Sequence, residues 1–366
     1  MANVLTDLAA DIYTAADTVG RELVGVIPSA TINTNATEVA AQGEVIRAAF
    51  TQEQAVSTVT PSMTIPEGAD QTVDNKTMTL SSTASVKIPW TGENIKFVNN
   101  GAGFDTIYGD QIKQAMRAIT NQIETEVALD IGDRASRAVG TAGTTPFASN
   151  FNTVAEVRQV LVDNGMPSND RQATLVINSA AGTKLRNLAQ LNQVDSSGND
   201  DMLRRGTLLD LQGLMMKESA GLDNHTAGTG SSATTDDAGY AVGATTITLA
   251  SAGTGTILAG DVVTFAGDTN QYVVTTGDGD VSGGGSIILG ENGLRVAIAA
   301  STTAITVAAA SVKNVAFHRS AVEIGVRGLA QPMGGDAAVD RLTVQDREAG
   351  IIYNIAAYKG YNKAMF

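Results

Sequence analysis

Cysteine is absent from the 366 residues, and histidine occurs twice, at His225 and His318. Without cysteine the chain can form no disulfide, thiol nucleophile or sulfur-ligated metal centre. Two histidines also argue against multi-histidine metal sites and most histidine relays. Aromatic residues make up 4% of a chain that is 43% hydrophobic, so the core must be aliphatic. These shortages remove most enzymatic chemistry and favour a structural protein.

Positive charge is also scarce, with 24 Lys and Arg against 38 Asp and Glu, a formal net charge of -14. Such a chain is poorly suited to wrapping nucleic acid by neutralising phosphates. Long apolar runs are missing too, and the first residues lack the basic region of a signal or transit peptide. We therefore expect neither a membrane anchor nor a targeting segment, and a chain compatible with a reducing cytosol.

Residues 5–24 carry apolar side chains at three- and four-residue steps, beginning with Leu5, Leu8 and Ile12. This spacing predicts an amphipathic helix. The helix either packs on its own domain or forms a detachable arm that docks on a partner, and the residues leave both interpretations open.

Residues 77–90 alternate between apolar and polar side chains, which predicts a long strand. An extended stretch at 44–60 could pair with it across a region rich in turn residues. A two-stranded hairpin is marginal alone in water because one face has nothing to bury against. It therefore needs another surface, in its own chain or in a neighbour.

Residues 105–139 give the strongest helical pattern. The apolar stripe steps by three or four through Ile112, Met116, Ile119, Ile123, Val127, Ile131 and Ala135. Most charged residues, Glu124 among them, are expected off that stripe. About thirty residues at 1.5 Å rise predict a rod of roughly 45 Å.

The next part, residues 151–221, mixes helices with short strands. Thr153 to Glu156 reads as a capping box that opens a helix ending at Gly165. A buried strand is expected at 174–178, a helix at 181–191 and an apolar run at 208–216. This alternation predicts a compact α+β unit.

Composition changes in residues 221–310, which hold 16 of the 38 glycines, no lysine and eight acids against the single base Arg295. Five short β patterns occur at 245–249, 261–265, 271–275, 286–289 and 304–307. They predict a small all-β barrel or sandwich inserted at a surface loop. Further strands are expected at 315–317 and 323–326, followed by a closing β pair at 341–344 and 351–357.

Residues that could carry chemistry lack the spacing that chemistry needs. The acids around Asp278 and Asp280, and those at Asp195, Asp200 and Asp201, do not follow a calcium-loop pattern. His318 could serve as the base of a hydrolase, but no nucleophile motif accompanies it. Four basic residues of the helical region, Lys113, Arg117, Arg134 and Arg137, read better as ion-pair partners than as nucleic-acid contacts.

The order of these parts resembles the major capsid proteins of tailed bacteriophages, which share the Hong Kong 97-type fold. The likeness is carried by the strand Thr77 to Trp90, the helix Asp105 to Val139, the stretch Asn314 to Ala321 and the ending Gly350 to Tyr361. The β insert, with Ala259 to Gly267 near its middle, resembles that of the short-tailed Salmonella phage branch.

The resemblance implies an α+β Hong Kong 97-type fold without catalytic, cofactor or metal sites. Its parts would be an N-terminal arm (1–42), an elongated loop (43–95), a peripheral domain with the spine helix (96–150), an axial domain (151–221), an inserted β-barrel (222–311) and a return through the axial domain to the strands of the peripheral domain (312–366). It further implies hexamers and pentamers in an icosahedral shell around packaged DNA, which is bound without sequence specificity. Scaffolding and portal proteins, and in some members a decoration protein, would be partners. Assembly would take place in the host bacterial cytoplasm, and the chain would reside in the virion capsid.

Candidate contact residues follow from this resemblance. Inter-subunit contacts are expected at Met63, Ile65, Glu67, Lys76, Lys113, Arg117, Arg134 and Arg137, and scaffolding or arm contacts at Leu5, Leu8 and Ile12. Some members crosslink a loop lysine to an asparagine, for which Lys76 and Asn362 would be the pair, although the insertion-bearing branch gives no reason to expect it. The alternative classes are a secreted or surface adhesin that binds glycans through the β-rich part, and a hydrolase built on His318.

Overall fold

The computed structural model describes residues 24–51, 56, 58–64, 73–99, 104–167, 170–192, 208, 210–346, 350–360 and 363–365. The chain forms two compact units. The first unit contains residues 1–17, 32–111 and 325–366, and the second contains residues 18–31 and 112–324. The predicted arm helix, with Leu5, Leu8 and Ile12, lies outside the described residues.

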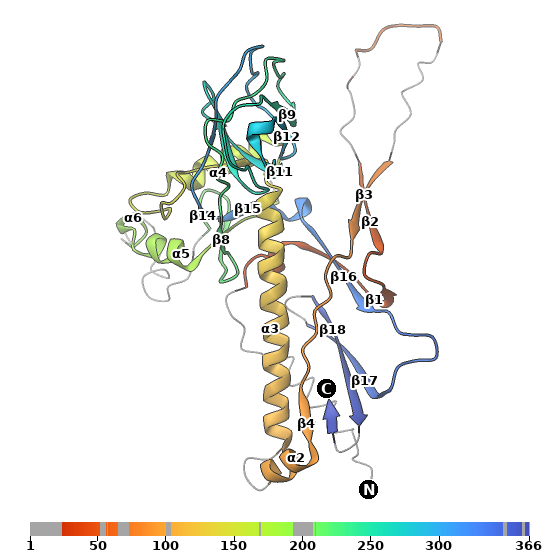
Figure 1. The fold of residues 1–366 in the computed structure, drawn as a ribbon. Coiled ribbons are helices and arrows are strands. Elements are labelled where there is room, and N and C mark those ends of the chain that lie inside the picture. The colour runs from red at the N-terminus through yellow and green to blue at the C-terminus, as the bar shows by residue number, and fades with distance from the viewer. Residues whose placement is uncertain are drawn as a thin grey trace. The chain divides into compact units, whose positions relative to one another are not determined.

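The main sheet of the first unit has four antiparallel strands in the order β17-β18-β19-β4. β17 (Ala338–Gln345) and β18 (Ile352–Gly360) form the closing pair that the sequence predicts (Figure 1). β19 (Lys363–Met365) then pairs with β4 (Pro89–Thr91), which is followed by the short helix α2 (Gly92–Asn99). Segments far apart in the sequence therefore complete one sheet.

Two further strand pairs belong mainly to the first unit. β1 (Thr31–Ala40) pairs with β16 (Glu323–Leu329), and Arg327 joins them by donating to the backbone and side-chain oxygens of Asn33. β2 (Val45–Thr51) pairs with β3 (Val73–Thr79) as an antiparallel hairpin. The expected arm over 1–42 therefore includes a sheet strand for which the sequence shows no pattern.

The return strand of the hairpin ends earlier than its alternating pattern predicts. Leu80 still exchanges hydrogen bonds with Gly43 and Glu44, but the chain then turns at Gly43, whose φ is +90°. Residues 81–88 consequently have no strand opposite them, and the predicted strand over 77–90 is wrong for these residues, whereas Pro89 and Trp90 belong to β4. Alternation alone does not make a strand when the ladder partner has turned away.

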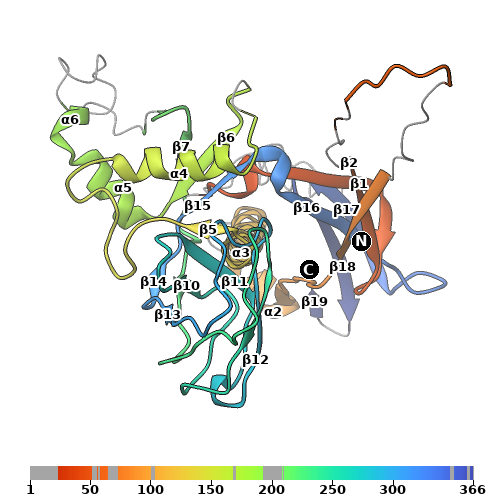
Figure 2. The same cartoon turned by 90° about the horizontal axis from the view of Figure 1, so that it is seen from above.

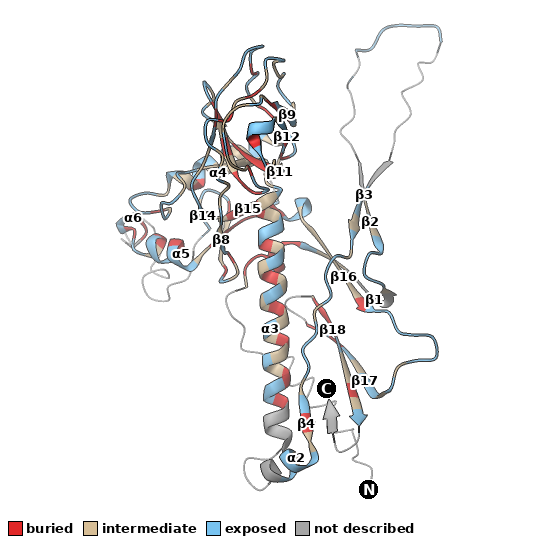
Figure 3. Cartoon of the chain, viewed as in Figure 1, coloured by how far each residue is buried: buried red, intermediate tan, exposed pale blue. Residues whose placement is uncertain are grey.

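Helix α3 (Phe104–Asp133) is the long helix that the sequence predicts, but it ends six residues before the expected end at Val139. The chain continues into β5 (Arg137–Ala138), which pairs with β11 (Gln271–Thr276) of the glycine-rich region. Buried positions recur along the helix (Figure 3) at four-residue steps, at Ile112, Met116, Thr120, Glu124 and Ala128. The predicted stripe is confirmed at its first two residues, whereas its later members are half-buried.

The α+β part of the second unit is built on a three-stranded sheet in the order β15-β6-β7. β6 (Ala173–Ile177) is antiparallel to β15 (Val315–His318) and parallel to β7 (Met215–Glu218). Helices α4 (Asn152–Asp163), α5 (Ser179–Arg186) and α6 (Ala189–Asn192) accompany it. Val154, Leu175, Ile177, Leu185 and Leu214 form its core.

The predicted capping box at Thr153 is wrong, because α4 starts one residue earlier and Asn150 accepts from the Asn152 amide instead.

The five β patterns of the glycine-rich region are all confirmed as strands. They are β9 (Thr246–Leu249), β10 (Val262–Phe265), β11 (Gln271–Thr276), β12 (Gly285–Leu289) and β13 (Ile305–Val307), in the order β13-β10-β11-β12-β9. Isolated bridges join Thr234 to Ala304, just before β13, and Thr235 to Leu249 of β9, so both edges of the sheet meet through one short segment. We call residues 222–311 the β-module.

The β-module is entered and left through a two-stranded neck, in which β8 (Asn224–His225) pairs with β14 (Ser311–Val312). Figure 2 looks along α3 and shows β10 and β11 on one side of it and α4 on another. β5, which follows α3, joins the module's sheet from outside residues 222–311. The boundaries near 221 and 311 therefore stay a prediction, because strand pairing crosses them.

Candidate assembly surfaces and buried polar sites

The chain between β2 and β3 exposes large apolar side chains. Relative to a fully accessible residue, Met63 is 107% exposed, Val56 is 100% exposed and Val59 is 91% exposed. Lys76 is exposed on β3, opposite Ala48. Ile65 and Glu67 lie outside the described residues, as does Asn362, the expected partner of Lys76 in a crosslink.

The base of the same hairpin is packed. Ile46 and Met78 are register partners and both are half-buried. A Cβ added at Gly325 of β16 would lie 3.0 Å from Ile46 Cδ1 and 3.6 Å from Met78 Cε, so these side chains rest on the β16 backbone. One end of the hairpin is therefore supported by its own unit, whereas the tip side chains are solvent-exposed.

The four basic residues expected at subunit contacts have different surroundings. Lys113 and Arg117 are half-buried on α3. Arg134 makes an exposed i,i+4 ion pair with Asp130, 2.8 Å from Nε to Oδ1. Arg137 lies on β5, after the helix, and its side chain is 7% exposed. Placing Arg137 on the helix surface was wrong, because strand pairing with β11 turns the chain inward.

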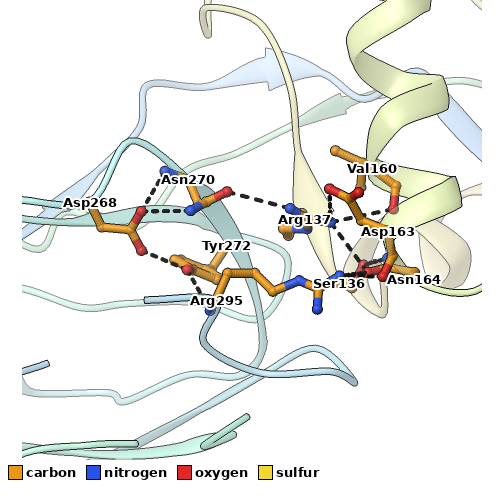
Figure 4. Close-up of polar contacts among 9 residues, drawn as sticks. All are labelled: Ser136, Arg137, Val160, Asp163, Asn164, Asp268, Asn270, Tyr272 and Arg295. Carbon is orange, nitrogen blue, oxygen red and sulfur yellow. Dashed lines mark hydrogen bonds and ion pairs between the residues drawn. The ribbon is translucent and has the colours of Figure 1, made fainter. Parts of the chain in front are cut away.

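Arg137 reaches the C-terminal end of α4, as Figure 4 shows. One guanidinium nitrogen donates to the Val160 carbonyl at 3.4 Å and to Asn164 Oδ1 at 3.3 Å. The same nitrogen lies 3.5 Å from an Asp163 carboxylate oxygen, and the other donates to Asn270 Oδ1 of the β-module at 3.4 Å. The last carbonyls of a helix lack partners within it, so a cation at this position both bonds them and complements the helix dipole.

A second arginine reaches the same helix end from the β-module. Arg295 donates to the Asp163 carbonyl at 2.5 Å and to Asn164 Oδ1 at 3.1 Å (Figure 4). Its own backbone amide donates to the Tyr272 hydroxyl, which donates to Asp268. Burial and the Asp268 carboxylate raise the pKa of Tyr272. The β-module therefore supplies part of the cap of α4.

Glu124 differs most from its sequence interpretation. It was expected on the polar face of α3, yet it is 1% exposed. Its carboxylate accepts hydrogen bonds from the backbone amides of Gly25, Val26 and Ile27 and from the Ser219 hydroxyl. The helical period places Glu124 in line with Ile112 and Met116, but it does not identify the donors, which lie about a hundred residues away along the chain.

The hairpin of β17 and β18 carries a charge cluster on its surface. Asp336 pairs with Arg341, accepts from the Tyr358 hydroxyl at 2.6 Å and accepts from the Ala338 amide at 3.0 Å. The pKa of Asp336 is lowered to about 2, mainly by the hydrogen bond from Arg341 and then by those from Tyr358 and the Ala338 amide. This cluster fixes the chain that leads into β17.

His318 contacts both an aspartate and a serine, but the geometry of these contacts is that of a structural cap and not of a catalytic site. Its Nε2 lies 2.9 Å from Asp170 Oδ2, and its Nδ1 lies 2.7 Å from the Ser320 hydroxyl. The Ser320 amide also donates to Nδ1, which is the cap of the short turn Arg319–Ala321. Because this nitrogen already caps a backbone amide two residues on, the geometry favours a strand-end cap over a catalytic base.

The other histidine holds the neck of the β-module. His225 Nε2 lies 2.8 Å from Oδ1 of Asp261, whose side chain is fully buried and also accepts from the Gly228 and Leu258 amides. Among the described residues no group of three or more His, Cys, Asp and Glu could hold a metal ion. Within the same residues, no helix is long and apolar enough to cross a membrane.

Neither a protein-family model nor a curated protein matches the chain. Solved structures do. One described as "Mycobacterium phage Che8" shares 16% identity at a TM-score of 0.36, covering 76% of this chain and 85% of that one. The "Asymmetric unit of bacteriophage PhiM1 mature capsid" shares 11% identity at 0.38, covering 79% and 84%. The "Capsid structure of the Cyanophage P-SCSP1u" shares 11% at 0.41, covering 84% and 90%.

The chain is thus similar to phage structures over most of its length. Two of the three descriptions name a capsid, and none names an enzymatic activity.

Proposed function

We propose that the chain is a capsid protein that assembles with copies of itself into a shell, and that it is a structural protein and not an enzyme. The observation that carries the proposal is the exposed hairpin tip. Val56, Val59 and Met63 are almost fully exposed, while the hairpin base is packed on β16. Exposed apolar side chains in the connection at the tip of a two-stranded hairpin gain stability by burial against another surface. A second copy of the chain supplies that surface in a shell.

The charge of the chain suits controlled assembly. A net charge of -14 makes like subunits repel, and salt screens that repulsion over about 10 Å at 0.1 M. The same charge keeps the inner wall of a shell from gripping DNA phosphates. Association is therefore expected to strengthen as ionic strength rises.

The finer part of the proposal follows from the resemblance in the sequence. The shell would be icosahedral, with hexamers and pentamers, and would enclose the double-stranded DNA of a tailed bacteriophage. The fold would be the Hong Kong 97 type, with residues 222–311 as the inserted domain of the short-tailed Salmonella phage branch. Scaffolding, portal and decoration proteins would be the partners, and the host bacterial cytoplasm the place of assembly.

Electron microscopy of the purified chain, in negative stain, tests the proposal together with sedimentation velocity at low and high salt. Closed shells or capsid-like rings, with a larger fraction assembled at high salt, are the expected result. A monomer at all salt and protein concentrations, with residues 43–95 already protected from hydrogen exchange, would overturn it. Monomers that bind a glycan would instead favour the adhesin alternative.

A further inference from the structure

A short segment near the N-terminus belongs to the second unit, although the chain on both sides of it belongs to the first. Residues 18–31 are grouped with 112–324, whereas 1–17 and 32–111 are grouped together. We call residues Val24–Ala30 of this segment the strap. Its Val26, Ile27 and Ala30 are at most 1% exposed, as completely buried as the core of the second unit. Val26 and Ala30 pack there with Ala128, Val176 and Phe317.

The strap is held by one carboxylate from the middle of α3. Glu124 Oε1 accepts from the Gly25 and Val26 amides, both at 2.7 Å, and Oε2 accepts from the Ile27 amide at 2.9 Å. Oε1 also accepts from the Ser219 hydroxyl at 2.6 Å, just after β7. Three successive amides thus converge on one carboxylate, and each bond is of the charge-assisted kind, about twice as strong as a neutral one.

The sequence of the strap suits the position in which Glu124 holds it. A Cβ at Gly25 would lie 2.9 Å from both Glu218 O and Val176 Cγ1, so a side chain there would displace the strap. Pro28 follows the three bonded amides and has no N–H of its own to satisfy. Ser29 closes the turn through its hydroxyl on the Gly25 carbonyl at 2.6 Å and its amide on the Val26 carbonyl at 3.0 Å.

Strap and carboxylate depend on each other. A buried carboxylate is tolerated only when its oxygens are fully hydrogen-bonded. If the strap left, Glu124 would keep only Ser219 among these four donors, while the three amides would have to find water. Two basic residues, Lys217 and Arg319, lie near each other. Burial and the positive charge of Arg319 lower the pKa of Lys217, whereas the negative charge of Glu124 raises it. Neither bonds the carboxylate in place of the strap among the described contacts.

We propose that Glu124 is the positioning residue that locks the strap into the second unit and so fixes the root of the N-terminal arm. The arm expected over residues 1–42 then divides into three parts. Residues 31–40 are a sheet strand, Val24–Ala30 is a permanently seated strap, and only residues before Val24 are left to serve as an arm. This inference goes beyond the proposed capsid function and holds for the unassembled subunit as well.

Hydrogen exchange followed by mass spectrometry on the full chain tests the lock. Glu124→Ala should speed exchange of the Gly25, Val26 and Ile27 amides at least tenfold. In Glu124→Gln the side-chain oxygen can still accept at the Oε1 position, so faster exchange is expected mainly at the Ile27 amide, whose acceptor Oε2 becomes an NH₂ group. Ser219→Ala should give a smaller increase. Glu126→Ala is the matched control on the exposed face of the same helix, where Glu126 accepts only from Gln122 among the described side chains, and it should leave these amides unchanged.

The strands β9–β13 serve as the internal reference, with unchanged exchange in every variant. Unaltered exchange at residues 25–27 in both Glu124 variants would overturn the proposal. Should Glu124→Ala fail to fold, Glu124→Gln and Ser219→Ala decide the question at the same amides. If the protection of residues 25–27 rises with protein concentration, Glu124 binds the strap of another copy, and this result would also overturn the proposal. Whether shells form is measured separately, so the two proposals can fail independently.

Discussion

Lys313 donates to Asp133 at 2.9 Å and thereby ties the chain leaving the neck of the β-module to the last residue of α3. Both side chains are mostly shielded from solvent, so the pair is less screened than an exposed one. Gly260 of the β-module packs against this pair from the other side, and a Cβ there would overlap both charged groups.

Gly260→Ala is expected to destabilise the second unit and to displace the ends of the Asp133 and Lys313 side chains. The residue has φ +83°, which costs an L residue about 1–2 kcal/mol, and overpacking adds about 1–3 kcal/mol. Gly267→Ala is the matched control, because Gly267 has φ +89° but nothing within 4 Å of its Cβ position. Because side-chain ends can move aside, thermal unfolding should show a larger loss for Gly260→Ala by about 1 kcal/mol, and equal losses would refute the steric role of the ion pair.

Arg137 and Arg134 offer a comparison between a buried and an exposed arginine three residues apart. Arg137→Ala removes the bonds to α4 and Asn270 and is expected to cost about 2–4 kcal/mol of unfolding free energy. Arg134→Ala removes one exposed i,i+4 pair and should change it by less than about 0.5 kcal/mol. Urea unfolding of both variants measures this, and similar values for the two would show that Arg137 does not hold the β-module on α4.

Acid should weaken the β17–β18 hairpin through Asp336. Its pKa is lowered from 3.8 to about 2, so the carboxylate contributes stability that is complete above about pH 4 and is lost as the pH falls through about 2. The stability difference between the wild type and Asp336→Asn should therefore shrink over this window. Asp340→Asn, on the same hairpin, is the control. A difference independent of pH between about 5 and about 2 would contradict the assignment.

A charge on the hairpin tip should block assembly without unfolding the subunit. Met63→Glu changes a fully exposed side chain, so the melting temperature of the subunit should stay the same. If the tip is buried against a second copy, an unpaired carboxylate there makes association unfavourable. Val242→Glu, at an exposed site of the β-module, is the control and should still assemble. Normal shells from Met63→Glu, seen by electron microscopy, would exclude the tip as a contact.

Sequence patterns located most elements because their signals are local. The five strands of the β-module were predicted within a residue or two, since alternating apolar residues between glycine turns leave little choice of register. The end of α3 was missed because pairing of Arg137 and Ala138 with β11 is a tertiary contact that overrides helix propensity. The end of β3 was missed because it depends on where its partner turns, at Gly43.

Buried polar residues were the part that sequence reasoning could not reach. Glu124 and Arg137 look like surface residues by type, and only their partners distinguish them. Those partners come from the strap, from α4 and from the β-module, all remote along the chain. A charged residue at a helix position in line with Ile112 and Met116 is the one signal that could have been followed, because four-residue steps from these reach Glu124.

The pairing of β4 with β19 has a consequence for the order in which a nascent chain can fold. β4 emerges from the ribosome early, yet its ladder partner at Lys363–Met365 is translated more than two hundred residues later. Residues 112–324 contain all the strands of the β-module and of the β15-β6-β7 sheet, so most of the second unit can fold during translation, domain by domain. The four-stranded sheet of the unit that carries the exposed hairpin closes only afterwards. A half-made polypeptide therefore presents the β2–β3 hairpin while the four-stranded sheet of the same unit is still incomplete.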